Sequence, residues 1–179
     1  MDVKEAIAKR RSIRKYQRKE VSADLIREVV DAARLAPSAS NAQPCRYYVI
    51  KDDETKERLK ENQIFQQDFV YQAPVLIVCC SDVQSYRQGV KGWSEENEHR
   101  ALRDLSIASA FLVLRATELG LATCYVGWMK KDKIKEVLDL PRSYMVPFVV
   151  AVGYGNEKPG PLPKRSMDEV LLYVDGQRK

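Results

Sequence analysis

The feature that most constrains the fold is a long apolar pattern between residues 101 and 119. Apolar side chains recur there at helical spacing, and small residues alternate with leucines in the set Ala101, Leu105, Ala108, Leu112, Ala116 and Leu119. This period predicts a helix that is buried on much of its surface, and Gly120 stands where a helix-ending glycine is expected. A helix of this kind is compatible with a position at a subunit interface.

Two shorter helices are predicted near the N-terminus. Asp2 and Glu5 have the spacing of a capping box that opens the first. Ser22 is a suitable N-cap for the second. The second has one apolar face at helical spacing, made of Leu25, Ile26, Val29, Val30 and Ala33. We expect this helix to end at Ala36, because a residue before proline is disfavoured in helical conformation.

Apolar runs predict four strands, at residues 46–50, 75–80, 123–128 and 148–154. Helices are expected at 53–61 and 130–140, and loops at 38–44 and 81–98. Strands that alternate with helices would by themselves favour a doubly wound parallel sheet. The dinucleotide fingerprint of such sheets is incomplete, however, because Lys158 stands where a third glycine should follow Gly153 and Gly155. A P-loop sequence is also absent, which argues against a P-loop nucleotidase.

Length and charge exclude several classes of protein. The 179 residues, 45% of them hydrophobic, favour one domain over residues 1–179. No apolar run reaches the roughly 20 residues of a membrane span, and the first residues lack a signal-peptide core, so a cytoplasmic protein is expected.

The net charge of +5 is spread along the chain, with basic clusters at 10–15 and 164–165. Such a distribution is atypical of nucleic-acid binders.

Cysteine and histidine give no sign of a metal site. The four cysteines are Cys45, Cys79, Cys80 and Cys124, and none has C-x-x-C spacing. We interpret them as structural thiols in a reducing compartment. The only histidine, His99, lies in a charged stretch and is expected at the surface.

Four segments, taken together, resemble the FMN-dependent nitroreductase family. They are RRSIRKY at residues 10–16, AARLAPSASNAQPCRYYVI at 32–50, ATELGLATCYVGWM at 116–129 and FVVAVGYGNEKP at 148–159, with a basic pair downstream. They occur in the family's order and extend over nearly the whole chain. The resemblance implies an α+β fold with a central mixed, mostly antiparallel sheet flanked by helices, and an intertwined homodimer.

The resemblance also implies an FMN site at the subunit interface. Arginine forks bind phosphate oxygens well, so Arg10 and Ser12, with Lys164 or Arg165, are expected around the FMN phosphate. Arg11 and Arg14 are expected to reach the ribityl chain and the pyrimidine edge of the ring. The alternative for both basic clusters is an ordinary solvated face.

Three further pairs or groups match flavin-contacting positions of the family. Pro37, Ser38, Ser40 and Asn41 match a loop offered by the other subunit, Gln66 and Gln67 match a polar pair facing the ring, and Gly127 and Trp128 match the turn near flavin N5. Each has a plain alternative: turn chemistry for the loop, solvated glutamines, and a packing role for Trp128. Cys45 stands where the family usually has tryptophan, which predicts an altered floor of the pocket.

The implied activity is hydride transfer from NAD(P)H through flavin N5 to a nitroaromatic, a quinone or another small conjugated acceptor, by a ping-pong mechanism. Flavin supplies this chemistry, so no protein residue is expected to be catalytic. The loop at 81–98, with Tyr86 and Trp93, is the expected lid over the pocket, and the alternative for these aromatics is a role as dimer contacts. Alternatives are a specialised reaction on the same flavin (reductive dehalogenation, flavin fragmentation or metabolite dehydrogenation), a non-catalytic flavin-binding module, and a nucleic-acid binder using RRSIRK.

Overall fold

A computed structural model describes residues 1–86 and 95–174 of the chain. The helices of these residues are α1 (Val3–Lys9), α2 (Ala23–Arg34), α3 (Asp53–Glu61), α4 (Phe69–Gln72), α5 (Glu95–Glu118), α6 (Lys131–Val137) and α7 (Met167–Val170), with short 3₁₀ turns η1 (Ala39–Asn41) and η2 (Val83–Ser85). The strands are β1 (Cys45–Ile50), β2 (Val75–Asp82), β3 (Ala122–Val126) and β4 (Tyr144–Gly153).

The strands form one sheet in the order β1-β2-β4-β3, and each neighbouring pair is antiparallel. A parallel bridge between Ser12 and Thr123 adds the N-terminal segment beside β3. The structure therefore confirms the predicted α+β architecture with a mostly antiparallel sheet. It excludes the doubly wound parallel sheet that the alternation of strands and helices alone would favour.

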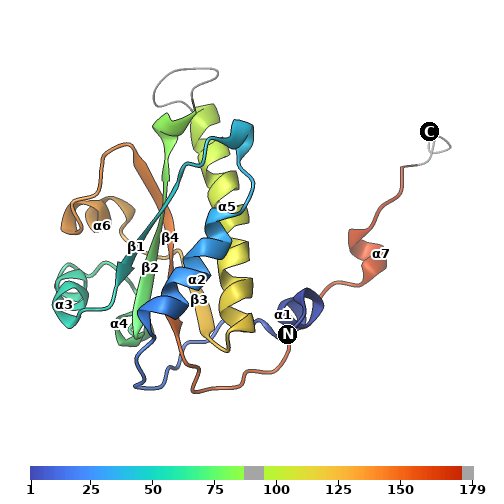
Figure 1. The fold of residues 1–179 in the computed structure, drawn as a ribbon, viewed down its shortest axis with the longest axis horizontal. Coiled ribbons are helices and arrows are strands. Elements are labelled where there is room, and N and C mark those ends of the chain that lie inside the picture. Colours follow the sequence, from blue (N-terminus) through green and yellow to red (C-terminus); the bar gives the residue numbers. More distant parts are fainter. Residues whose placement is uncertain (87–94, 175–179) are drawn as a thin grey trace.

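Helices cover both faces of this sheet (Figure 1). The helices α2 and α5 pack on one face, against alternate β2 residues such as Val75, Ile77 and Cys79. The other face, which carries Leu76, Val78 and Cys80, packs against α3, α4 and α6. Because successive strand residues point to opposite faces, a strand that is covered on both sides must be apolar throughout. This explains the uninterrupted run VLIVCC.

The long helix is confirmed and extends further than the apolar pattern suggests. Acidic side chains at Glu95, Glu96 and Glu98 favour the first turn of α5. At its other end, Gly120 has a φ of +76° and the Leu121 N–H donates to Ala116 O at 2.8 Å. Helix-ending glycines adopt this left-handed conformation without strain. The predicted N-caps Asp2 and Ser22 are confirmed as well.

Some predicted boundaries were wrong. The expected loop at 81–98 is occupied at its ends by β2, by η2 and by the start of α5, and α2 ends at Arg34 rather than at Ala36. The strand expected from residue 148 begins at Tyr144. Its first half was missed because it contains Pro147, which lies where the β2–β4 register shifts. A proline is tolerated within a sheet at such an irregularity.

The C-terminal segment that carries α7 extends away from the body of the molecule (Figure 1). Seven large apolar side chains on it are exposed: Leu162, Met167, Val170, Leu171, Leu172, Tyr173 and Val174. Ser166 and Glu169 form a capping box for α7. Within the described part of the chain, no helix has the length and apolar character needed to cross a membrane.

Candidate functional site

The basic segment at residues 10–16 is held by backbone hydrogen bonds between β3 and the chain after β4. The Ile13 N–H donates to Thr123 O at 3.0 Å, and the Asn156 N–H donates to Lys15 O at 2.8 Å. The hydroxyl of Tyr16 donates to Ile13 O at 2.7 Å and closes the segment on itself. The sheet edge thus sets the backbone path on which Arg10, Ser12 and Arg14 are carried.

The Glu157 carboxylate ties the same segment down a second time. It accepts the backbone N–H of Arg14 and, at 3.2 Å, the N–H of Lys15. Close packing at Gly155 supports this contact, since a Cβ there would lie 3.2 Å from the Cβ of Ala122. Sequence reasoning missed Glu157, although an acidic residue beside a basic motif is a usable signal.

A cleft of about 470 Å³ opens beside the segment. Its lining includes Arg10 and Arg11 from the segment, Thr117 from α5, and Thr123 and Lys158. The Arg11 guanidinium donates to Ala8 O at 2.7 Å and to Arg10 O at 2.8 Å. In this structure Arg11 therefore satisfies carbonyls at the end of α1, whereas its predicted contact with the ribityl chain stays a prediction.

Cys124 is buried on β3, next to the residue that forms the bridge with Ser12. Burial raises the pKa of its thiol, while the guanidinium of Arg14 and a hydrogen bond from Ser12 act in the opposite direction. Arg14 and Ser12 are thus brought to one place on the sheet. Lys164 and Arg165 lie on the exposed C-terminal segment, and their meeting with Arg10 at a phosphate stays a prediction.

The predicted flavin-covering loop is a tight turn between α2 and β1, which we call the 37–43 turn. Ser40, Asn41 and Gln43 all have positive φ values, of 51°, 53° and 48°. The Ser38 hydroxyl oxygen accepts the Gln43 N–H at 2.9 Å and closes the turn. The turn borders a mainly polar cleft of about 730 Å³, which it lines together with Arg46, Tyr86, Arg100 and others.

A buried carboxylate on α5 holds this turn. The Asp104 side chain is only 2% exposed, and its Oδ2 accepts the Ala39 N–H at 2.8 Å and the Tyr86 hydroxyl at 3.0 Å. Oδ1 accepts from the Arg103 guanidinium at 3.3 Å. Sequence reasoning missed Asp104; the available signal was a lone charged residue on the apolar face of the helix, where ionisable groups require partners.

Tyr86 corrects one prediction about the lid. Its side chain is 5% exposed and points into the core to reach Asp104, so it is not an aromatic of a loop that stacks on flat substrates. The reason is the polar tip of tyrosine, which seeks a partner when the ring is buried. The other lid residue, Trp93, lies outside the described residues.

The glutamine pair and the predicted N5 turn come together at the far end of β3. An antiparallel bridge joins Phe65 to Met129, and the Lys130 N–H donates to Ile64 O at 2.9 Å. Gln66 and Gln67 directly follow Phe65, and Gly127 and Trp128 directly precede Met129. Trp128 is 70% exposed, so it is no core aromatic of this chain. A Cβ on Gly127 would meet only Pro147 O within 4 Å, at 3.9 Å, which leaves the backbone open to a ligand.

Cys45, where the family usually has tryptophan, borders a slot of about 280 Å³ between α2 and β1. Burial raises the pKa of the Cys45 thiol to about 11, with the Asp104 carboxylate adding to the rise. The thiol therefore stays protonated at neutral pH and has little nucleophilic character. This agrees with its interpretation as an inert cysteine.

Two of the predicted flavin-contacting segments, the basic segment and the 37–43 turn, lie toward opposite ends of α5. The 37–43 turn is bonded to Asp104, and the cleft at the basic segment includes Thr117. Thirteen helical residues separate these positions, which amounts to about 20 Å along the helix axis. In one chain the basic segment and the turn are therefore well apart, and we refer to them as the two predicted half-sites.

Comparisons with known proteins place these observations in a family. A family model described as "Nitroreductase family" matches residues 7–65 and 60–154 of the chain. An NADH dehydrogenase of Thermus thermophilus is 30% identical, over 97% of this chain and 96% of its own length. A protein of Methanothermobacter thermautotrophicus described as an NADH dehydrogenase/NAD(P)H nitroreductase is 36% identical, over 89% of this chain and 81% of its own length.

A solved structure agrees with this assignment. A Desulfovibrio desulfuricans protein described as a nitroreductase in complex with FMN is 27% identical, with a TM-score of 0.83 over 98% of both chains. The order of motifs and the antiparallel sheet agree with these relatives. The chain belongs to the nitroreductase family.

Proposed function

We propose that this protein is an NAD(P)H-dependent FMN oxidoreductase whose flavin sites are shared between two copies of the chain. The observation that carries the proposal is the basic segment, which the sheet edge and Glu157 hold beside a cleft lined by Arg10 and Arg11. Relatives support it, since one is solved with FMN and another is an FMN reductase (NADPH) of Bacillus subtilis.

The residues present fit FMN by the chemistry of their donors. Arg10, Arg14 and the Ser12 hydroxyl offer charged and neutral donors for phosphate and ribityl oxygens. Gln66 and Gln67 provide amides at a turn beside Gly127, where the absence of a side chain admits a flat ring. Lys164 or Arg165 would add a second positive charge at the phosphate.

FMN, when bound, accepts a hydride from NAD(P)H and passes electrons to a small conjugated acceptor such as a nitroaromatic or a quinone. The chain's own residues bind, orient and shield the cofactor. Cations near the pyrimidine edge, for which Arg14 is the candidate, stabilise negative charge there. The two substrates are expected to use the same pocket in turn, which gives ping-pong kinetics.

We propose a homodimer because one chain does not bring its two half-sites together. Across a two-fold axis, the 37–43 turn of one subunit would complete the site at the basic segment of the other. The outer face of α5 supports this arrangement, since Leu102, Ile107 and Phe111 are 42%, 37% and 42% exposed there. An apolar stripe of this kind on a helix is suited to packing against a second subunit.

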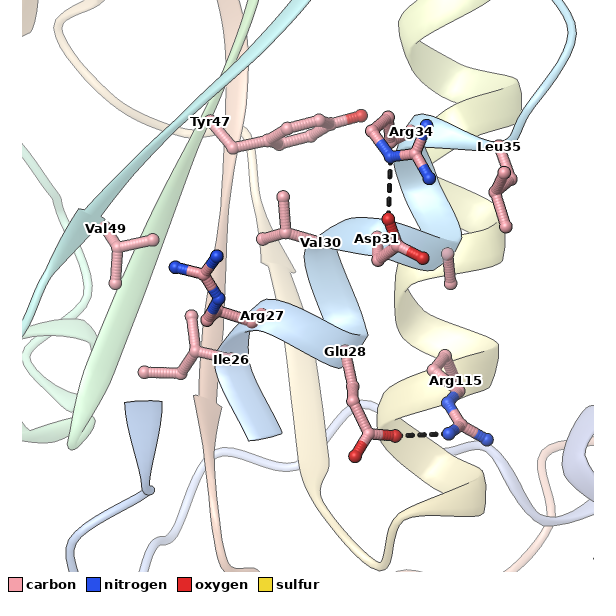
Figure 2. A pocket seen from close by; sticks show the side chains of 11 residues that line it. Ile26, Arg27, Glu28, Val30, Asp31, Arg34, Leu35, Tyr47, Val49 and Arg115 are labelled. Atoms are coloured by element: carbon pink, nitrogen blue, oxygen red, sulfur yellow. Dashed lines mark hydrogen bonds and ion pairs between the residues drawn. The ribbon is translucent and has the colours of Figure 1, made fainter. Parts of the chain in front are cut away.

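The exposed C-terminal segment is expected to cross onto the partner subunit. Apolar residues 171–174 gain little from the body of their own chain, as their exposure shows. A groove of about 840 Å³ between α2 and the free edge of β1 is a suitable receptor, with Ile26, Val30 and Val49 along it (Figure 2). Strand edges and apolar grooves are common docking sites for extended segments.

The compartment that we propose is the cytoplasm. All four cysteines are free, and Cys79 and Cys80 are fully buried on the central strand β2. Free thiols of this kind are typical of reducing compartments.

The test is the visible spectrum of the purified protein, with NADH or NADPH added under anaerobic conditions. We expect flavin absorption bands that bleach on addition of a nicotinamide, followed by recovery when a quinone or nitroaromatic is added. A colourless protein that does not bind added FMN would contradict the proposal. Poor turnover with all generic acceptors, despite bleaching, would instead favour a specialised reaction on the same flavin.

A further inference from the structure

The 37–43 turn is joined to α5 by a hydrogen bond to a buried carboxylate, that of Asp104. Asp104 is almost fully removed from solvent, and burying a carboxylate is costly unless donors compensate it. The Ala39 N–H and the Tyr86 hydroxyl both donate to one oxygen, and Arg103 supports the other. Packing alone would favour an apolar side chain at position 104, because its buried neighbours on α5 include Ala101, Leu105 and Ala108.

The turn itself requires support. Ser40, Asn41 and Gln43 adopt left-handed backbone conformations, which glycine and asparagine tolerate but serine and glutamine rarely adopt. Conformations of this kind persist where the surroundings over-determine them. Inside the turn, the Gln43 N–H donates to the Ser38 hydroxyl, and the Asn41 and Ala42 N–H groups donate to the carbonyls of Ser38 and Ala39. From outside, the Asp104 carboxylate accepts the Ala39 N–H.

We propose that Asp104 and Tyr86 are positioning residues for the 37–43 turn, and that through this turn they set the environment of the flavin bound in the partner subunit. Asp104 holds the Ala39 N–H and thereby the start of the left-handed run. Tyr86 holds the carboxylate in its orientation and brings the chain after β2 against the turn. The second half of this proposal rests on the proposed function, whereas the first half concerns the turn alone.

The test compares Tyr86→Phe and Asp104→Asn with Tyr125→Phe as the matched control. The Tyr125 hydroxyl also donates to α5, to the Ser109 hydroxyl at 2.9 Å, but it does not touch the turn. The first readout is hydrogen exchange of the Ala39 amide in FMN-free protein. We expect exchange to be about 3- to 10-fold faster in both test variants and unchanged in the control.

The second readout is the visible circular dichroism of bound FMN together with its affinity. We expect an altered flavin spectrum and about 3- to 10-fold weaker binding in the two test variants only. If Asp104→Asn fails to fold, the milder Tyr86→Phe carries both readouts.

Each outcome has a defined meaning. Unchanged Ala39 exchange in the folded test variants, or the same change in the control, would overturn the anchoring role. Faster exchange with an unaltered flavin spectrum would overturn the link to the flavin. Failure of the unmodified protein to bind FMN would contradict the proposed function, while Ala39 exchange would still decide the anchoring role.

Discussion

The basic segment at 10–16 and the 37–43 turn are both predicted flavin contacts, yet they are held in different ways. Backbone hydrogen bonds to the sheet edge and to residues 154–156 hold the basic segment, and the side chains of Glu157 and Tyr16 add to these backbone bonds. The turn depends on the side chains of Asp104 and Tyr86, and three of its residues have left-handed backbone conformations. The comparison suggests that the basic segment supplies binding charge, while the turn supplies a shape that a few side chains can alter.

The largest effect is expected from Arg10→Ala in the basic segment. Loss of a charge-assisted bond to phosphate should weaken FMN binding about 10- to 100-fold, measured by quenching of flavin fluorescence. Arg18→Ala is the control, because Arg18 is an exposed arginine beyond the segment. Equal affinities of Arg10→Ala and unmodified protein would remove the phosphate role from Arg10.

The turn and the basic segment can be compared by the same chemical change, since each is held by a tyrosine hydroxyl, that of Tyr86 and that of Tyr16. Tyr86→Phe removes a donor to a buried carboxylate, and we expect a fall in Tm of about 3 to 10 °C. Tyr16→Phe removes a donor to the carbonyl of Ile13, and we expect a fall of about 1 to 6 °C. Differential scanning calorimetry on FMN-free protein measures both, and a larger fall for Tyr16→Phe would reverse the comparison.

Sequence patterns predicted those elements that are determined by residues close together in the chain. The apolar period of α5, the caps Asp2 and Ser22, and the doubly buried run of β2 follow directly from residue order. The first half of β4 was missed because Pro147 interrupts its strand pattern, and Tyr86 was misplaced because its hydroxyl is bonded to a carboxylate on α5. Asp104 was missed because one of its partners, Ala39, lies 65 residues away.

For the candidate site, the sequence indicated the segments involved but not the residues that hold them in place. The family motifs located the basic segment, the turn and Gly127, and the structure places the Gln66–Gln67 pair beside Gly127 and Trp128. Motifs do not show how such segments are supported, so the roles of Glu157 and Asp104 required the structure. Contacts that involve a second copy of the chain stay predictions.

The smallest effect is expected at the two cysteines that lie near these segments. Burial and the Asp104 carboxylate raise the pKa of Cys45 to about 11, whereas Arg14 opposes the rise at Cys124. The thiolate is the reactive form, so labelling of Cys45 by iodoacetamide should be slow at pH 8 and should accelerate as the pH rises toward about 11. Asp104→Asn removes the negative charge, which lowers the pKa and should speed labelling at pH 8 by a few-fold.

Peptide mass spectrometry identifies the labelled cysteine. Cys45→Ser confirms the assignment, because it should abolish labelling at this peptide. Labelling of Cys45 at pH 8 as fast as that of an unfolded control peptide would contradict the raised pKa.

The central claim is that each flavin site is built from two chains, and mixed dimers test it most directly. One chain carries Arg10→Ala, the other carries Ser38→Ala with Asn41→Ala, and differently tagged copies are purified together. Each homodimer has two impaired sites, but a mixed dimer whose subunits share their sites regains one site with native Arg10 and a native turn. The account predicts one tight FMN site per mixed dimer, while mixed dimers that bind FMN as weakly as both homodimers would contradict it.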